Sequence, residues 1–379
     1  MDQRLSDLPQ HDLYTYELGA VFLEDAMPPQ TAYSEKAGTW ISEPVWPSAN
    51  VTEVTHPLGA HSIRPPEAPG DDRILTLSSP LTVGLYAGKW CAYAAGPDLA
   101  GDQRAEDGGC LVFETEPLDE DLVILGRPRV DLTVTPDAPV AMVAARLSDV
   151  MPDGQAARVT YGLLNLCHRD GHEQPEPLAP GETHTARVWM NDAAKVFRAG
   201  HPLRLSLSTS YWPLAWPAPS AVDLRVHLEG TTLTLPVRRA DAPAGGPFDA
   251  PRTALPLAVS TVHPGESTWR VEHDLTDGRS TLHVIKDEGR TRLEEDGLEM
   301  WTDTREAYSV RAGDFTSPRG ETLWRRGFER DGWRVETVTR TVLTCDAERF
   351  YLRAELDAYE GDVRIWSKNW DEAIPRRLV

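Results

Sequence analysis

The densest group of metal-ligating side chains lies in the segment CHRDGHEQ, which supplies Cys167, His168, His172 and Glu173. Zinc takes three or four sulfur, nitrogen or carboxylate ligands in tetrahedral geometry, and this segment offers nearly that set. The Arg-Asp-Gly run at its centre is also ordinary turn chemistry. A polar turn is the competing interpretation, and we expect no metal and no cofactor.

No nucleophile of a recognisable type is present. The nucleophile elbow GxSxG is absent, as are the P-loop, GxGxxG and HExxH motifs. His11 has no matching motif around it. We therefore assign no catalytic residue to this chain.

The segment WRRGFERDGWRV, residues 324–335, alternates arginines with aromatic side chains, as single-strand nucleic-acid platforms do. The whole chain, however, carries 38 basic and 59 acidic residues and a net charge of −21. Nucleic acids and anionic membranes both need positive charge, so we expect neither as a partner. The alternative is an ordinary β-hairpin that turns at Asp331 and Gly332.

Twelve tryptophans suggest a third possibility, a carbohydrate-binding module in which exposed indoles stack on sugar rings. Two of them end the segment LRLSLSTSYWPLAWPAPS, in which Leu203, Leu205 and Leu207 alternate with polar residues. Prolines stop such a strand from extending a sheet. The segment therefore either closes a core or presents an apolar surface.

The elements that would position these residues are short strands of period two, separated by Gly, Pro and Asp turns. One-sided strands such as RVDLTVTP and TTLTLPVRR suit two antiparallel sheets packed face to face. We predict an all-β chain with a leading segment, a β-sandwich, a Pro/Gly/Ala-rich linker and a second β-rich domain. Their predicted bounds are 1–43, 44–239, 240–264 and 265–379.

The remaining features indicate a soluble, cytoplasmic protein. The hydrophobic share is 40%, and no apolar run approaches the ~18 residues of a membrane span. The first residues lack the pattern of a signal peptide. Four scattered cysteines form no CxxC pair, so we expect free buried thiols.

Three stretches resemble a known family: GDQRAEDGGCLVFETEPLDEDLVILGRPRVDLTVTPDAP, VAARLSDVMPDGQAARVTYGLLNLCHR and LSLSTSYWPLAWP. They are similar to the C-terminal β-sandwich of CocE/NonD-type serine hydrolases, which are related to X-Pro dipeptidyl-peptidases, cocaine esterase and α-amino-acid ester hydrolases. The resemblance covers residues 22–379, where the tail through WSKNWDEAIPRRLV is similar to an extension of one subgroup. It implies a jelly-roll, galactose-binding-like sandwich.

The resemblance also implies where function lies. In the family, the Ser-Asp-His triad belongs to an α/β-hydrolase domain N-terminal to the sandwich, and the sandwich shapes one wall of the substrate cleft. The residues that would form such a docking surface or cleft wall are Trp90, Asp102, Gln103, Arg104, Trp212 and Trp216. Both loops would otherwise cap the sandwich core, with Asp102 and Arg104 as a local ion pair.

We therefore expect the non-catalytic C-terminal portion of an ester, amide or X-Pro dipeptidyl-peptidase hydrolase, truncated or split, that is inactive alone. Its partner would be an α/β-hydrolase domain on another chain, or a second copy through self-association. A docking sandwich should expose an apolar patch around Trp212 and Trp216 or around Trp90. The alternative function is a stand-alone carbohydrate- or protein-binding module.

Overall fold

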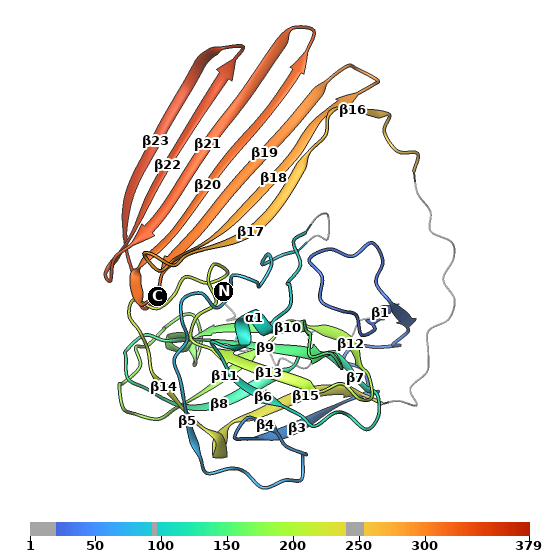
Figure 1. Cartoon of the computed structure of the whole chain (residues 1–379), viewed down its shortest axis with the longest axis vertical. Coiled ribbons are helices and arrows are strands. Elements are labelled where there is room, and N and C mark those ends of the chain that lie inside the picture. Colours follow the sequence, from blue (N-terminus) through green and yellow to red (C-terminus); the bar gives the residue numbers. More distant parts are fainter. Residues whose placement is uncertain (1–19, 93–96, 240–253) are drawn as a thin grey trace, which may run out of the picture.

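The computed structural model describes residues 20–92, 97–239 and 254–379. His11 and residues 240–253 of the expected linker lie outside the described residues. Nearly all of the described secondary structure is β, in two bodies that follow one another along the chain (Figure 1).

A β-sandwich forms the lower body in Figure 1. Its strands are β1 (Val21–Glu24), β2 (Gly38–Ile41), β3 (Val51–Gly59), β4 (Ser62–Ile63), β5 (Ile74–Leu77), β6 (Leu111–Glu114), β7 (Leu122–Gly126), β8 (Arg129–Pro136), β9 (Met142–Val150), β10 (Ala156–Asn165), β11 (His184–Trp189), β12 (Ala193–Phe197), β13 (Leu203–Ser208), β14 (Leu224–His227) and β15 (Thr232–Arg238). The short helices are α1 (Arg104–Asp107), η2 (Leu166–His168) and η3 (Leu228–Gly230). The predicted all-β sandwich is confirmed, while its jelly-roll, galactose-binding-like topology stays a prediction.

The two layers are joined through β3. One layer runs β10-β9-β13-β6-β4, and the other contains β2-β1-β12-β7-β15 together with β8, β11, β14 and β5. Strand β3 pairs with β15 in one layer and with β4 in the other. Strand β1 pairs in parallel with β12, so the sandwich begins before residue 44 and includes part of the predicted leading segment.

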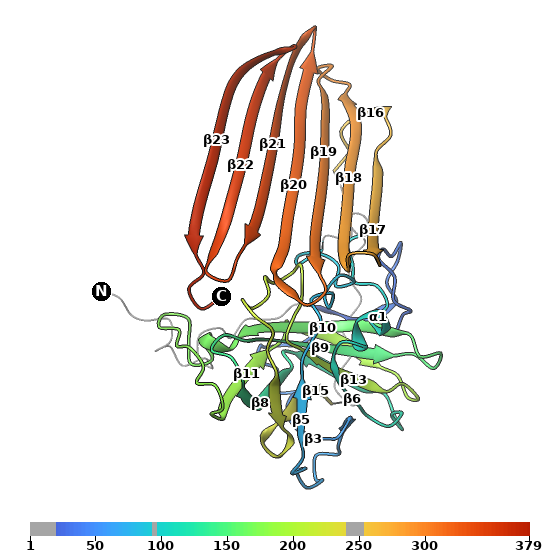
Figure 2. The same ribbon diagram turned by 60° about the vertical axis from the view of Figure 1, so that its left-hand side comes forward.

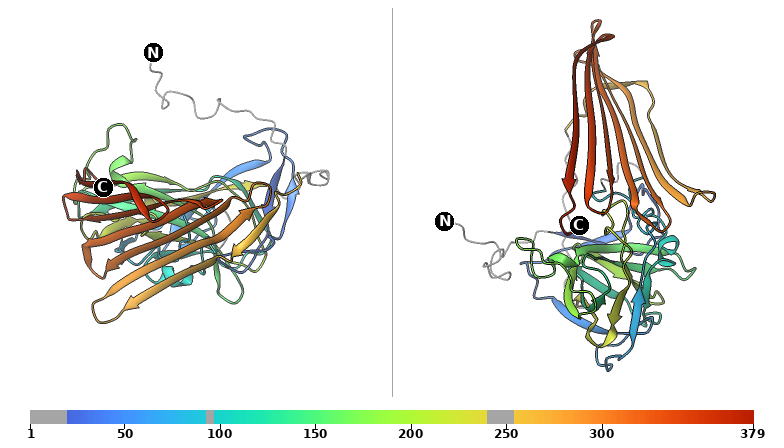
Figure 3. Two further views of the ribbon diagram at one scale, coloured as in Figure 1. Left: turned by 90° about the horizontal axis from the view of Figure 1, so that it is seen from above. Right: turned by 90° about the vertical axis from the view of Figure 1, so that its left-hand side faces the viewer.

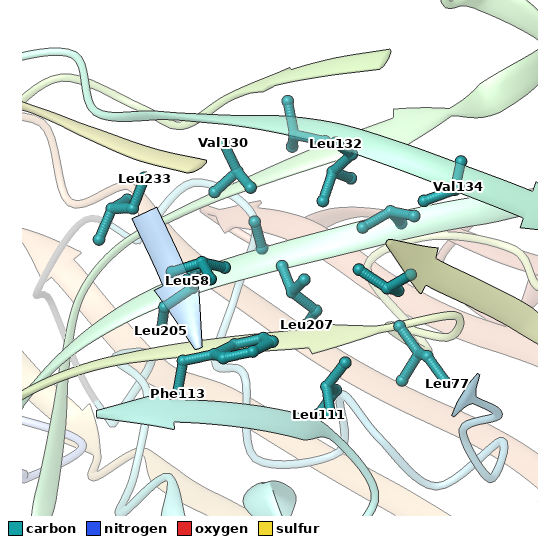
Figure 4. Close-up of a cluster of buried hydrophobic side chains, with 14 of the residues drawn as sticks. Leu58, Leu77, Leu111, Phe113, Val130, Leu132, Val134, Leu205, Leu207 and Leu233 are labelled. Atoms are coloured by element: carbon teal, nitrogen blue, oxygen red, sulfur yellow. The ribbon is translucent and has the colours of Figure 1, made fainter. Parts of the chain in front are cut away.

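The side chains between the layers form the core shown in Figure 4. Val130, Leu132 and Val134 of β8 are at most 2% exposed and face Leu205 and Leu207 of β13. Their spacing of two residues is why a half-buried strand could be recognised in the sequence. A chain segment also covers the other face of β13, where Ser206 donates a hydrogen bond to Asp107, so its polar residues do not face water.

The C-terminal residues form a second, separate sheet. Its strands are β16 (Val259–His263), β17 (Glu266–Asp274), β18 (Arg279–Leu293), β19 (Glu299–Arg311), β20 (Asp314–Arg330), β21 (Trp333–Cys345), β22 (Arg349–Glu360) and β23 (Val363–Pro375). Strands β17 to β23 follow one another as an antiparallel meander, with β16 beside the other end of β18. Strand β16 therefore falls inside the residues predicted as linker.

The hairpin predicted at Asp331 and Gly332 is confirmed. Arg330 pairs with Trp333 across a two-residue turn, and both turn residues have a positive φ, of 52° and 79°. This conformation matches the twist of the flanking strands, and Gly adopts it without steric cost.

Trp212 connects the two bodies. The C-terminal sheet stands above β9 and β10 of the sandwich (Figure 2), and Trp212 packs between the two bodies among Leu81 and Leu85 of the sandwich and Leu282 and Val284 of the sheet. Only 1% of Trp212 is exposed. The sheet therefore attaches to the sandwich through an apolar contact.

Replacing Trp212 with alanine should destabilise the chain, because it opens a cavity in this contact. Loss of a buried tryptophan costs about 3–5 kcal/mol. The measurement is urea unfolding followed by fluorescence and circular dichroism. Trp90→Ala is the matched control, since Trp90 is 61% exposed and its loss should change stability by no more than about 0.5 kcal/mol. Equal stability of the two variants would contradict this role for Trp212.

Candidate functional site

The segment DQR before helix α1 organises its own loop. Arg104 Nη2 lies 2.6 Å from Asp102 Oδ2, and Asp102 Oδ1 accepts hydrogen bonds from the backbone N–H groups of Arg104 and Ala156. Partial burial raises the pKa of Asp102, but the bonds from Arg104 and the backbone outweigh it and hold this pKa below its usual value. The local ion pair weighed in the sequence analysis is therefore present.

Gln103 is fully buried and bridges three segments. Its Nε2 donates to the carbonyl oxygens of Gly101 and Tyr86, and its Oε1 accepts from Arg146 Nη1 at 2.7 Å. Because its amide groups are used in these internal hydrogen bonds, the Gln103 side chain stabilises the fold. Of the three predicted residues in this loop, only Arg104 lies with half of its side chain exposed.

A buried charge network lies behind the loop. Arg146 of β9 has only 1% of its side chain exposed and donates to Asp107 at 3.0 Å. Glu106, also buried, accepts from the backbone N–H groups of Gly84 and Tyr86. Burial raises the pKa of Glu106, and the nearby Arg146 opposes that rise. The network therefore fixes the backbone of the segment that leads to Trp90.

Trp90 lies exposed on a rigid support. Its ring meets Tyr161 of β10 edge to face, with centroids 5.9 Å apart, and Tyr161 donates a hydrogen bond to the Trp90 carbonyl. The guanidinium of Arg158 lies 4.4 Å from the Tyr161 ring centroid and donates to Ala87 O and to Tyr211 Oη. An exposed indole with a preorganised base is typical of binding surfaces.

Tyr161 and Arg158 also line a cavity of about 250 Å³. The other residues of its lining include Asp25, Tyr33 and Lys195. Burial lowers the pKa of Lys195, whose ammonium donates to the Asp25 carbonyl at 2.7 Å. The described residues that line the cavity include no serine, cysteine or histidine, and side chains such as those of Arg158 and Asp25 offer charged contacts for a polar ligand.

Trp212 and Trp216 lie elsewhere and face the chain's own C-terminal sheet. Their rings meet edge to face at 4.9 Å, and Trp212 also contacts Tyr308 of β19. Trp216 Nε1 donates to Cys345 Sγ at 3.3 Å. The C-terminal sheet therefore covers the patch that was expected to be exposed around these two tryptophans. The sequence did not predict this, because a strand pattern does not reveal which distant segment packs on the strand.

The CHRDGHEQ segment forms a loop after β10. Cys167 is buried, with its thiol 3.5 Å from the Pro139 carbonyl, while His168 and His172 contact each other. Among the described residues, no group of three or more His, Cys, Asp or Glu side chains is arranged to hold a metal. All four cysteines are free, but Cys91 is exposed, contrary to the expectation of buried thiols.

Glu106, Arg146 and Tyr161 were not identified as candidate residues from the sequence. Arg146 carried a usable signal, since it is a charge inside the apolar run VAMVAARL of β9. A charge at such a position needs buried partners. Tyr161 gave no comparable signal.

Comparison with known proteins gives the family. The X-Pro dipeptidyl-peptidase C-terminal non-catalytic domain matches residues 24–266, more than half of the chain. The chain therefore belongs to this family, and the resemblance to the C-terminal part of CocE/NonD-type hydrolases is confirmed.

The relatives include enzymes of the expected type. A putative serine esterase of Mycobacterium bovis is 24% identical over 238 residues, which cover 55% of this chain and 37% of that protein. The cocaine esterase of a Rhodococcus species is 28% identical over 103 residues, covering 27% of this chain and 18% of the enzyme. The chain thus matches well under half of the length of these relatives.

Solved structures show similar coverage. An aminopeptidase from a marine sediment archaeon has a TM-score of 0.46 at 18% identity, over 55% of this chain and 40% of that one. A CocE/NonD family hydrolase from Staphylococcus aureus has a TM-score of 0.43 at 14% identity, over 57% of this chain and 40% of that one.

In the described residues, no helix is long and apolar enough to cross a membrane.

The stability that the ion pairs of Arg198 give to the fold beside the cavity should decrease in acid. Hydrogen bonds from Arg198 lower the pKa of Asp25, and a backbone N–H together with Arg198 lowers that of Asp121. A lowered pKa in the folded state stabilises the chain above the unfolded-state pKa of about 4, and this stabilisation is lost as pH falls through the lowered values. Arg198→Met should therefore flatten the fall of Tm with decreasing pH.

The measurement is thermal unfolding at several pH values from about 6 down to 3. The control is Arg127→Met, which removes the exposed pair between Arg127 and Asp192 and should change little. An Arg198→Met curve parallel to that of the unmodified chain would refute this assignment.

Proposed function

We propose that this chain is the non-catalytic portion that completes a CocE/NonD-type hydrolase, and that the surface around Trp90 docks against an α/β-hydrolase domain outside these 379 residues. The observation that carries the proposal is the exposed Trp90 ring, which packs edge to face on Tyr161, a residue that itself lines the cavity. Large exposed aromatics on a fixed backbone are frequent anchors of protein interfaces.

The cavity would then face the substrate cleft. Its walls combine Arg158 and Lys195 with Glu24 and Asp25, so they offer charged and polar contacts for orienting a substrate. The reaction would be acyl transfer from an ester or amide to water. The partner domain would provide the serine nucleophile, its base and the oxyanion hole.

The carbohydrate- or protein-binding alternative uses the same exposed indole in a different way. Sugar stacking needs no second domain and would appear as direct glycan binding by the chain alone. A glycan screen of the unmodified chain and of Trp90→Asp separates this alternative from docking.

The first step of the test is to read the DNA upstream of the Met1 codon in all three frames for a GxSxG elbow with a later Asp and His. The domain found there is produced with this chain, and hydrolysis of p-nitrophenyl butyrate is measured. We expect ester hydrolysis by the combination and none by the chain alone. The absence of such a coding sequence from this DNA, or hydrolysis that is the same without this chain, would refute the proposal.

Trp90→Asp should weaken binding of the hydrolase domain by about tenfold or more, because a charge replaces an apolar anchor. Binding is measured by isothermal titration calorimetry. Trp189→Asp is the control, since Trp189 is also partly exposed, at 40%, but lies on β11. Equal affinities for both variants would place the interface elsewhere.

A further inference from the structure

We propose that a second copy of this chain binds to one face of the C-terminal sheet, so that two such sheets pack face to face. This inference is independent of the proposed hydrolase partner. It begins with the alternation of side chains along β19 to β23.

The paired registers divide these strands into two faces of opposite character. One face, called here the apolar face, is formed by every second residue: Met300, Thr302, Thr304, Glu306, Tyr308, Val310, Thr322, Trp324, Arg326, Phe328, Arg330, Trp333, Val335, Thr337, Thr339, Thr341, Leu343, Cys345, Phe350, Leu352, Ala354, Leu356, Ala358, Glu360, Val363, Trp366, Lys368, Trp370, Glu372 and Ile374. The intervening residues form the charged face.

The charged face is suited to water. Arg340 pairs with Glu321 at 2.7 Å, and Arg290 pairs with both Glu299 and Glu329 at 2.5 Å. These groups are linked across neighbouring strands. A face built of such pairs needs no apolar cover.

Part of the charged face depends on a glycine. A Cβ at Gly327 would lie 2.0 Å from the ring of Trp301, so only glycine lets this indole lie flat across β20. Arg290 and Arg334 then contact the same ring, with guanidinium-to-centroid distances of 4.8 and 5.3 Å. The main aromatic side chain of the charged face, Trp301, is therefore already covered by other residues of the same sheet.

The sandwich covers only the base of the apolar face. Tyr308 meets Trp212, Phe350 meets Trp216, and Lys89 pairs with Glu306 at 3.2 Å. Above this row, Figures 2 and 3 show a single layer of strands, with no other described segment packed against it.

The uncovered part therefore leaves aromatic side chains in solvent. Trp324 is 43% exposed and Phe328 38% on β20, and Trp366 is 46% exposed on β23. An apolar sheet face is normally buried against a second layer. A contiguous patch of this kind marks an interaction surface.

The charges of the apolar face favour a second copy as the occupant. The chain carries a net charge of −21, which opposes association of two copies through most of their surface. The apolar face of β19 to β23 has three basic and three acidic residues, and one of the acidic ones is already paired with Lys89 at the covered base. They are Arg326, Arg330, Lys368, Glu306, Glu360 and Glu372. The uncovered charges nearly balance, so this surface can meet its own copy with little net repulsion.

The size of the patch also fits a dimer. With strands about 4.8 Å apart and about 3.3 Å per residue, the uncovered part of the face would bury on the order of 1,300 Å² in total from two copies. Stable interfaces begin near that size. The threonines Thr337, Thr339 and Thr341 lie along the centre of the face on β21, where short side chains allow two sheets to interdigitate.

The test is sedimentation equilibrium of the full chain from about 1 to 100 µM, with reductant present because Cys91 is exposed and free. We expect a closed dimer. Thr339→Arg, which puts a bulky charge at the centre of the apolar face, should raise the dimer Kd at least about 100-fold. Val338→Arg is the matched control on the opposite face of the same strand and should leave the Kd within about threefold.

Circular dichroism confirms that both variants fold before they are compared. A chain that stays monomeric at the highest concentration overturns the proposal and leaves the face to a hydrolase domain or another partner. A dimer that Thr339→Arg does not weaken, or open-ended aggregates instead of a closed dimer, also overturns it. The unmodified chain gives a decisive result even if a variant fails to fold.

Discussion

The close approach of the 81–90 segment to the backbone of Trp212 connects every part of this structure. A Cβ at Gly84 would lie 2.3 Å from the Trp212 carbonyl oxygen, and the φ of Gly84 is +115°, so this contact requires glycine on both grounds. Glu106 holds the Gly84 N–H from the sandwich side. Trp212 in turn supports the C-terminal sheet, and the same segment ends at the exposed Trp90. The core, the second sheet and the candidate docking surface thus share one support.

This arrangement separates two surfaces with different properties. The surface around Trp90 combines one aromatic anchor with a charged cavity, which suits a partner that must also orient a polar substrate. The apolar face of the C-terminal sheet has nearly balanced charges and a row of threonines, which suits a flat, self-complementary contact. The two surfaces share no residues, so the two proposed partners would not compete for the same side chains.

Local patterns in the sequence predicted the local structure well. The alternation of Val130, Leu132 and Val134 and the turn at Asp331 and Gly332 both depend on neighbouring residues, and both were confirmed. The partner of Trp212 could not be predicted, because the strands that cover it lie about 70 residues or more further along the chain. The same limit applies to Gln103, which reads as an exposed loop residue but is buried against Arg146.

The central claim is that Trp90, and not Trp212, faces the hydrolase domain. Hydrogen–deuterium exchange of this chain, alone and with a CocE/NonD-type α/β-hydrolase domain, tests it most directly. The account predicts slower exchange in residues 84–92 and in β10 on binding, with no change in residues 209–217, since Trp212 is already covered. Protection of residues 209–217 with unchanged exchange around Trp90 would contradict it.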